Sequence, residues 1–393
     1  MKHCLIFITV FLTSQLLLGQ TNNSSEKIKE IDNLIQKLIT SKSTSGFAFG
    51  IQLGDADPIT KEYGFADQSN GIKIVPTDQF RIASITKPFT ATAILKLVES
   101  GKLSLTDNIA RFFPDYPNGA NISIYHLLSH TSGIPNWWEG GMPADVPKEF
   151  PMCEKPHQYL QAMKNNALFQ PGEFYKYSNS GYVLLGEIIE TISGLPYNNF
   201  LEENIFIPAG MTSTEMEYIE KPSRRWVKGY AVDTSKNIPF VDPEVYDMPF
   251  SAGGLRSNAL DLLKFIKALN SGKIISMESV KRMTSYALLN GGEPVYERPY
   301  RAPNGKPNKP HKEFAKSGYG LGFNIMELYG TPVYYHSGGI AGFNSYLIRI
   351  PKNNITMVLL ANTEDGIIPE LKGILKVATE IDDQKLRSAA EDR

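Results

Sequence analysis

The chain has 393 residues, of which 42% are hydrophobic and 21% are charged, and its formal net charge at pH 7 is −1. This composition is typical of a globular protein with a sizeable core, and the length suits one large domain or two modest ones. The absence of a basic excess argues against nucleic acid as a partner.

The first residues have the layout of a secretory signal peptide. Lys2 precedes the almost wholly apolar stretch 4–18, and small or polar residues follow it. The apolar stretch is shorter than the roughly 20 residues of a membrane-spanning helix. We therefore expect residues 1–20 to be a cleaved signal, with no stable membrane insertion afterwards, and the protein to be exported to the periplasm or secreted. An uncleaved membrane anchor is the alternative.

Hydrophobic periodicity predicts the secondary structure along the chain. Apolar residues at helical spacing predict helices over 29–38, 82–99, 183–192, 259–269 and 369–381. Stretches with strand-like composition lie at 46–53, 61–66, 333–336, 345–350 and 355–360. Residues 290–318 are dense in Gly, Pro, Asn and Lys, which predicts a long loop.

The order of these elements indicates how the chain is divided. Strands and helices at both ends of the chain bracket a mostly helical middle. The simplest packing joins the two ends into one sheet-containing lobe, 25–80 and 315–385, with 81–314 as a mostly helical lobe of the same domain, 21–393.

Three short motifs could carry chemistry. Ser84-Ile-Thr-Lys87 places a hydroxyl and an amine on one face of a helix start, and lysine can activate serine if its pKa is lowered. Tyr177-Ser-Asn179 offers a phenol and an amide, although, taken alone, a loop that caps the next helix is the better interpretation. His336-Ser-Gly338, followed by Gly339, could form a strand edge that binds a peptide-like carbonyl.

In this order and at these separations, the motifs resemble the active-site elements of the serine β-lactamase and penicillin-binding protein superfamily, in its class C β-lactamase and D-alanyl-D-alanine carboxypeptidase branch. The stretches 127–134, 251–255 and 319–323 are also similar to that branch. The resemblance covers roughly residues 25–365. It implies an α+β fold in which an antiparallel sheet is flanked by N- and C-terminal helices, with a mostly helical lobe and the site between the two.

The resemblance also implies a role for each motif residue. Ser84 attacks the carbonyl as the nucleophile, and Lys87 and Tyr177 share the proton transfers. His336 stands where many members have lysine, so its charge near a substrate carboxylate is expected to depend on pH. The groups expected to bind the substrate are Asn179, His336, Ser337 and Gly338, with the backbone N–H groups of Ser84 and Gly339 as the oxyanion hole.

We expect neither a cofactor nor a metal ion. His126 and His130 are four residues apart, but Leu127 stands where a zinc-protease motif needs glutamate. A packed structural role is the better interpretation of His130.

The resulting hypothesis is a serine hydrolase that cleaves an amide, peptide or β-lactam bond in a small-molecule or peptide substrate through an acyl-serine. D-alanyl-D-alanine carboxypeptidase and β-lactamase-like activities lead. Class C β-lactamases typically have Lys-Thr-Gly as the third element, so His336-Ser-Gly338 argues against an efficient β-lactamase. The alternatives are a carboxylesterase on the same fold and a non-hydrolytic β-lactam sensor or binding protein. No oligomeric state is predicted.

Overall fold

A computed structural model describes most of the chain. The predicted signal at residues 1–20 and part of the predicted loop at 290–318 lie outside the described residues, so the signal stays a prediction. Within the described part, no helix combines the length and apolarity that a membrane span requires. The described residues are 25–136, 167–217, 225–233, 238–241, 249–299 and 314–381.

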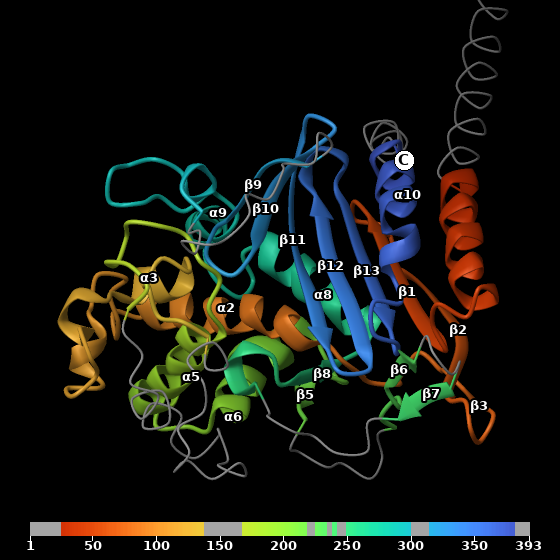
Figure 1. Cartoon of the computed structure of the whole chain (residues 1–393), viewed down its shortest axis with the longest axis horizontal. Coiled ribbons are helices and arrows are strands. Elements are labelled where there is room, and N and C mark those ends of the chain that lie inside the picture. The colour runs from red at the N-terminus through yellow and green to blue at the C-terminus, as the bar shows by residue number, and fades with distance from the viewer. Residues whose placement is uncertain are drawn as a thin grey trace, which may run out of the picture.

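The largest sheet has eight strands, and all neighbouring strands are antiparallel (Figure 1). Their order is β3-β2-β1-β13-β12-β11-β10-β9, so the first strand of the chain pairs with the last one. The strands are β1 (Gly46–Leu53), β2 (Ile59–Asp67), β3 (Ile72–Lys73), β9 (Phe314–Tyr319), β10 (Asn324–Leu328), β11 (Thr331–Ile340), β12 (Phe343–Ile350) and β13 (Ile355–Ala361).

One face of this sheet packs against the two terminal helices. The helix at residues 25–40 and α10 (Ile368–Thr379) lie side by side in Figure 1. Phe47, Phe49 and Ile51 of β1 point to this face and share a core with both helices. Side chains alternate along a strand, so the intervening residues of β1 point to the other face.

The opposite face packs against α8 (Ala259–Asn270). A Cβ on Gly50 would lie 3.1 Å from Leu263 Cδ1, so the glycine lets the helix approach β1 closely. Because both faces are covered, β1 is apolar along nearly its whole length, as its sequence GFAFGIQL shows.

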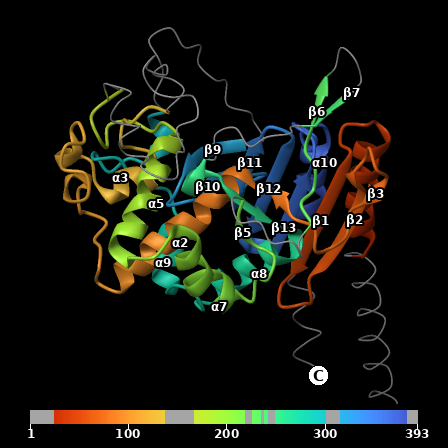
Figure 2. The same ribbon diagram turned by 90° about the horizontal axis from the view of Figure 1, so that it is seen from below.

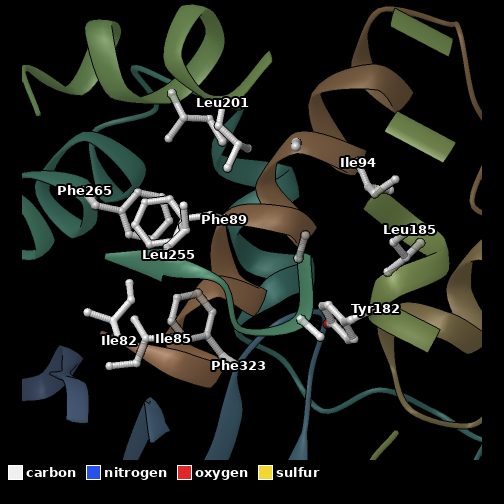
Figure 3. Packing of buried hydrophobic residues seen from close by; sticks show 14 of the residues in the cluster. Ile82, Ile85, Phe89, Ile94, Tyr182, Leu185, Leu201, Leu255, Phe265 and Phe323 are labelled. Atoms are coloured by element: carbon white, nitrogen blue, oxygen red, sulfur yellow. The ribbon is translucent and has the colours of Figure 1, made fainter. Parts of the chain in front are cut away.

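A largely helical layer lies beside the sheet (Figure 2). At its centre is α2 (Thr86–Glu99), which is buried on most sides. Phe89 stacks on Phe265 of α8, with 3.9 Å between ring centroids, and Figure 3 shows the two rings face to face. The other helices are α3 (Ile124–Leu128), α5 (Asn179–Ser193), α6 (Tyr197–Leu201), α7 (Ile207–Ala209) and α9 (Met277–Met283).

Two small sheets complete the described structure. A three-stranded sheet has the order β4-β8-β5 and contains β4 (Phe80–Arg81), β5 (Glu215–Met216) and β8 (Leu255–Ser257). The second small sheet is a two-stranded hairpin of β6 (Tyr230–Asp233) and β7 (Ile238–Val241).

The predicted fold class is confirmed: an antiparallel sheet is flanked by terminal helices and accompanied by a mostly helical lobe. The prediction of a loop over 290–318 was wrong at its C-terminal end, because residues 314–319 form β9. The helix predicted over 82–99 begins instead as a 3-10 turn, Ala83–Ile85, before α2. The residue boundaries proposed for the two lobes stay a prediction.

Phe89→Ala is expected to lower the free energy of unfolding by about 3 to 5 kcal/mol, because the lost ring leaves a cavity between α2 and α8. Urea denaturation followed by circular dichroism measures the change. Met277→Ala is the control, since this side chain is 52% exposed, and its effect should stay within about 0.5 kcal/mol. Equal effects of the two substitutions would contradict the packing described.

Candidate active site

A strained turn between β4 and α2 carries Ser84. Ala83 has a φ of +46°, a left-handed conformation that is costly for a residue with a Cβ. Thr86 Oγ1 donates to the Ala83 carbonyl at 2.7 Å and accepts from the N–H of Leu255 in β8 at 3.1 Å. These bonds hold the turn and place Ser84 immediately before α2.

The side chain of Lys87 is completely buried next to this serine. Its Nζ lies 3.1 Å from Ser84 Oγ, 2.6 Å from Asn179 Oδ1 and 2.7 Å from the Ala252 carbonyl oxygen. Burial lowers the pKa of Lys87 well below its usual value of 10.5. The structure thus brings the first two motifs into direct contact.

Tyr177 reaches the same hydroxyl group, because its side chain is hydrogen-bonded to Ser84. Lys87 Nζ lies 4.8 Å from the centroid of the Tyr177 ring. Burial raises the pKa of Tyr177 well above 10, so the phenol keeps its proton at neutral pH. Ser84, Lys87 and Tyr177 therefore form one contiguous cluster.

Two side chains hold the Tyr177–Asn179 segment in place. Asn136 Oδ1 accepts from the Asn179 N–H at 2.7 Å, and Asn136 Nδ2 donates to the Tyr177 carbonyl at 3.3 Å. The Ser178 N–H donates to His130 Nδ1 at 3.1 Å, and the rings of His130 and Tyr177 are 4.2 Å apart between centroids. The packed structural role predicted for His130 is confirmed.

His336 lies on β11, and only 1% of the residue is exposed. Its ring centroid is 6.2 Å from that of Tyr177, so the third motif also joins the cluster. Nδ1 is 2.7 Å from the Ser337 carbonyl, which can only accept, so Nδ1 carries the proton. In the neutral ring, Nε2 then accepts from the Tyr319 hydroxyl at 3.0 Å.

Burial lowers the pKa of His336 to about 3, with a smaller contribution from the nearby Lys87. The expectation that its charge changes near neutral pH was therefore wrong, because the imidazole is neutral throughout that range. The residue type alone does not reveal this shift, because it arises from burial of the ring, and both ring nitrogens are bonded inside the protein.

Strand β11 passes directly beside the turn that carries the serine. A Cβ on Gly338 would lie 2.2 Å from the Ile82 carbonyl oxygen, so only glycine permits this approach. A Cβ on Gly339 would meet nothing within 4 Å, and this residue is exposed. Gly338 therefore closes the packing against the turn, while Gly339 borders open space. The oxyanion and substrate-binding roles of Gly339, Gly338 and Ser337 stay predictions.

Sequence reasoning missed several groups that complete the cluster. Ala252 contributes a backbone carbonyl, which has no residue-type signature. Tyr319 and Ala252 fall in stretches that resemble the superfamily, and this was the one signal that could have indicated them. Asn136 lies two residues beyond such a stretch, and nothing in its sequence context pointed to the segment that it holds.

A family model described as Beta-lactamase matches residues 31–373. The chain belongs to the serine β-lactamase and penicillin-binding protein superfamily. Serine hydrolases, among them D-amino acid amidase, are members of this superfamily.

Individual relatives support the same assignment. The chain is 33% identical to PbpX of Bacillus subtilis (strain 168) over 265 residues, which are 66% of this chain but only 64% of PbpX. It is 28% identical to Penicillin-binding protein 4* of the same organism over 370 residues, 90% of this chain and 76% of that protein. Its fold is similar to that of the D-amino acid amidase from Ochrobactrum anthropi SV3 complexed with D-phenylalanine. That match has a TM-score of 0.71 and 26% identity, and it covers 92% of this chain and 99% of the amidase.

In ¹⁵N-labelled protein, the imidazole signals of His336 are expected to remain those of the neutral, Nδ1-protonated ring from pH 8 to pH 5, because its pKa in the folded protein is about 3. The ordinary histidine pKa is about 6.5, so the unfolded chain takes up this proton first. The residue therefore lowers the free energy of unfolding as the pH falls from about 6.5 to about 3. Loss of the signals in His336→Gln assigns them, and a titration midpoint above pH 5 would contradict the buried geometry.

Proposed function

We propose that this protein is a serine hydrolase that cleaves amide bonds through an acyl-enzyme on Ser84. The environment of Lys87 Nζ carries the proposal. Asn179 Oδ1 and the Ala252 carbonyl can only accept hydrogen bonds, so a neutral amine donates its two N–H groups to them. Its lone pair is then left for Ser84 Oγ, at 3.1 Å. This is the arrangement in which an amine removes a hydroxyl proton.

The proposed reaction begins when Ser84 Oγ attacks the substrate carbonyl carbon and its proton passes to Lys87. Tyr177 then gives its phenolic proton to the departing nitrogen and takes the proton from Lys87. In the second half, a water molecule attacks the acyl group, and its proton returns to Ser84 by the same groups. The high pKa of Tyr177 favours this role as a proton donor over that of a permanent phenolate base.

The polarity of the site favours substrates that have no carboxylate beside the scissile bond. His336 stands where many members of the superfamily have lysine, but it is neutral and both of its nitrogens are already bonded. Asn179 Oδ1 is held by Lys87, which leaves the amide N–H₂ of Asn179 for a substrate carbonyl. D-Alanyl-D-alanine peptides and β-lactams both carry a carboxylate near the reacting bond. A simple D-amino acid amide carries none, and the similarity to a D-amino acid amidase supports this choice.

Purified protein is expected to hydrolyse D-phenylalanine amide with a higher kcat/KM than a D-Ala-D-Ala peptide or nitrocefin, because a neutral His336 gives no attraction to a carboxylate. Product release measured over the same concentration range for each substrate tests this order. Hydrolysis of p-nitrophenyl acetate alone would favour the carboxylesterase alternative. A fluorescent penicillin that labels the protein and never leaves would favour the sensor alternative.

Ser84→Ala should abolish turnover of every substrate in that panel, because no acyl-enzyme can form. Lys87→Ala should lower kcat by a factor of about 10² to 10⁴, the usual scale of general acid–base catalysis. Lys102→Ala removes an exposed lysine just beyond α2 and is the matched control, with kcat expected to be unchanged. Full activity in Ser84→Ala would refute the assignment of the nucleophile.

The layout of residues 1–20 supports the further proposal that this reaction takes place outside the cytoplasm, in the periplasm or after secretion.

A further inference from the structure

The face of the large sheet that α8 covers becomes polar at one end. Val358 of β13 is aligned with Gly50 of β1 on one side and with Leu347 of β12 on the other. This row of aligned residues belongs to the apolar core. The next row on the same face, two residues further along each strand, consists of Gln52, Thr356 and Arg349 on β1, β13 and β12. Gln52 and Thr356 are 5% and 4% exposed, so this row is a buried polar floor.

A cavity of about 480 Å³ opens on this floor, between the sheet and the C-terminal part of α8. The described residues of its wall include four cationic side chains and one carboxylate, that of Asp55, which leaves an excess of three positive charges. The whole chain, by contrast, has a net charge of −1. The cationic side chains are those of Lys264, Lys267, Lys273 and Arg349.

Arg349 is held in a fixed orientation by neutral groups. Its guanidinium donates to Thr356 Oγ1 at 3.4 Å, to Asn354 Oδ1, and to the hydroxyl of Tyr334. The Tyr334 hydroxyl in turn donates to Asn270 Oδ1, at the end of α8, at 2.8 Å. Within the described ranges, no carboxylate lies within ion-pair distance of Arg349. Its charge is therefore oriented but not neutralised.

The lysines of the wall differ in how they are used. Lys264 donates to the Gly210 carbonyl at 2.8 Å and lies 3.4 Å from Asp261 Oδ1. Lys267 and Lys273 are exposed and form no ion pair with the residues that the structure describes. Cations near a helix C-terminus stabilise the helix dipole. That effect accounts for Lys267, but it does not explain the polar floor or the oriented arginine on the sheet.

We propose that this cavity binds a small, hydroxyl-rich phosphate ester, with the phosphate between Arg349 and the two exposed lysines. A guanidinium held in a fixed orientation can donate two parallel hydrogen bonds to two oxygens of one phosphate. The ammonium groups of lysine add positive charge on flexible side chains. The volume of the cavity lies within the range of about 300 to 1,000 Å³ that small-molecule sites have. A cavity of this size has room for a ligand larger than a phosphate ion. No aromatic ring lies among the described lining residues, so the rest of the ligand is polar, as in a sugar phosphate.

Isothermal titration calorimetry of the full chain with glucose 6-phosphate, at fixed low ionic strength, tests the proposal. Glucose 6-phosphate is expected to bind and glucose is not. The double variant Lys267→Gln with Lys273→Gln should raise Kd roughly tenfold, since each exposed charge contributes modestly. Lys102→Gln with Lys281→Gln removes the same charge from exposed sites elsewhere, and Kd should change less than about twofold.

Three results would overturn the proposal. The first is an absence of glucose 6-phosphate binding to the unmodified protein. The second is an equal loss of affinity in both double variants, which would indicate unspecific charge attraction. The third is an unchanged Kd in Lys267→Gln with Lys273→Gln, which would place the ligand outside this cavity. The binding measurement does not depend on whether the proposed hydrolase activity is found.

Discussion

The arrangement of this protein depends on the burial of one amine. A charged lysine is costly to bury without a counter-charge, and the cost falls when the group is neutral and fully hydrogen-bonded. Lys87 meets Ser84 on its own helical turn, Asn179 at the start of α5 and Ala252 just before β8. Displacing any of these segments would leave a buried polar group without its partner. The contacts of Lys87, on which the proposed activation of Ser84 rests, thus also fix three separate parts of the chain relative to one another.

Around this amine lies a compact group of neutral rings. His130 and His336 each pack against Tyr177 and Tyr319, and burial lowers the pKa of both histidines. A positive charge on Lys87 lowers the pKa of each histidine further. The three bases therefore disfavour one another's protonation. Of these three bases, Lys87 is the one that lies within hydrogen-bond distance of Ser84 Oγ.

The sequence indicated the local features and, through the resemblance, the convergence of three distant motifs, but it missed features that depend on particular tertiary contacts. Strand β1 was predicted at its observed bounds, because a buried strand is apolar whichever element covers it. Ser84 and Lys87 could be paired because three residues along a helix lie on one face. Strand β9 was missed, since its loop-like composition is outweighed by pairing with β10. The charge of His336 could not be predicted either, because it depends on burial and on the hydroxyl of Tyr319.

The pairing of β1 with β13 also has a consequence for biosynthesis. Phe47 aligns with Ala361, so one edge of β1 stays unpaired until β13, more than 300 residues later, has been translated. At ribosomal speeds of about 5 to 20 residues per second, this delay is roughly 15 to 60 s. An unpaired apolar edge is a template for aggregation. The nascent chain therefore presents this unpaired edge until β13 has been released, and the cluster that includes His336 of β11 cannot assemble before most of the chain has been translated.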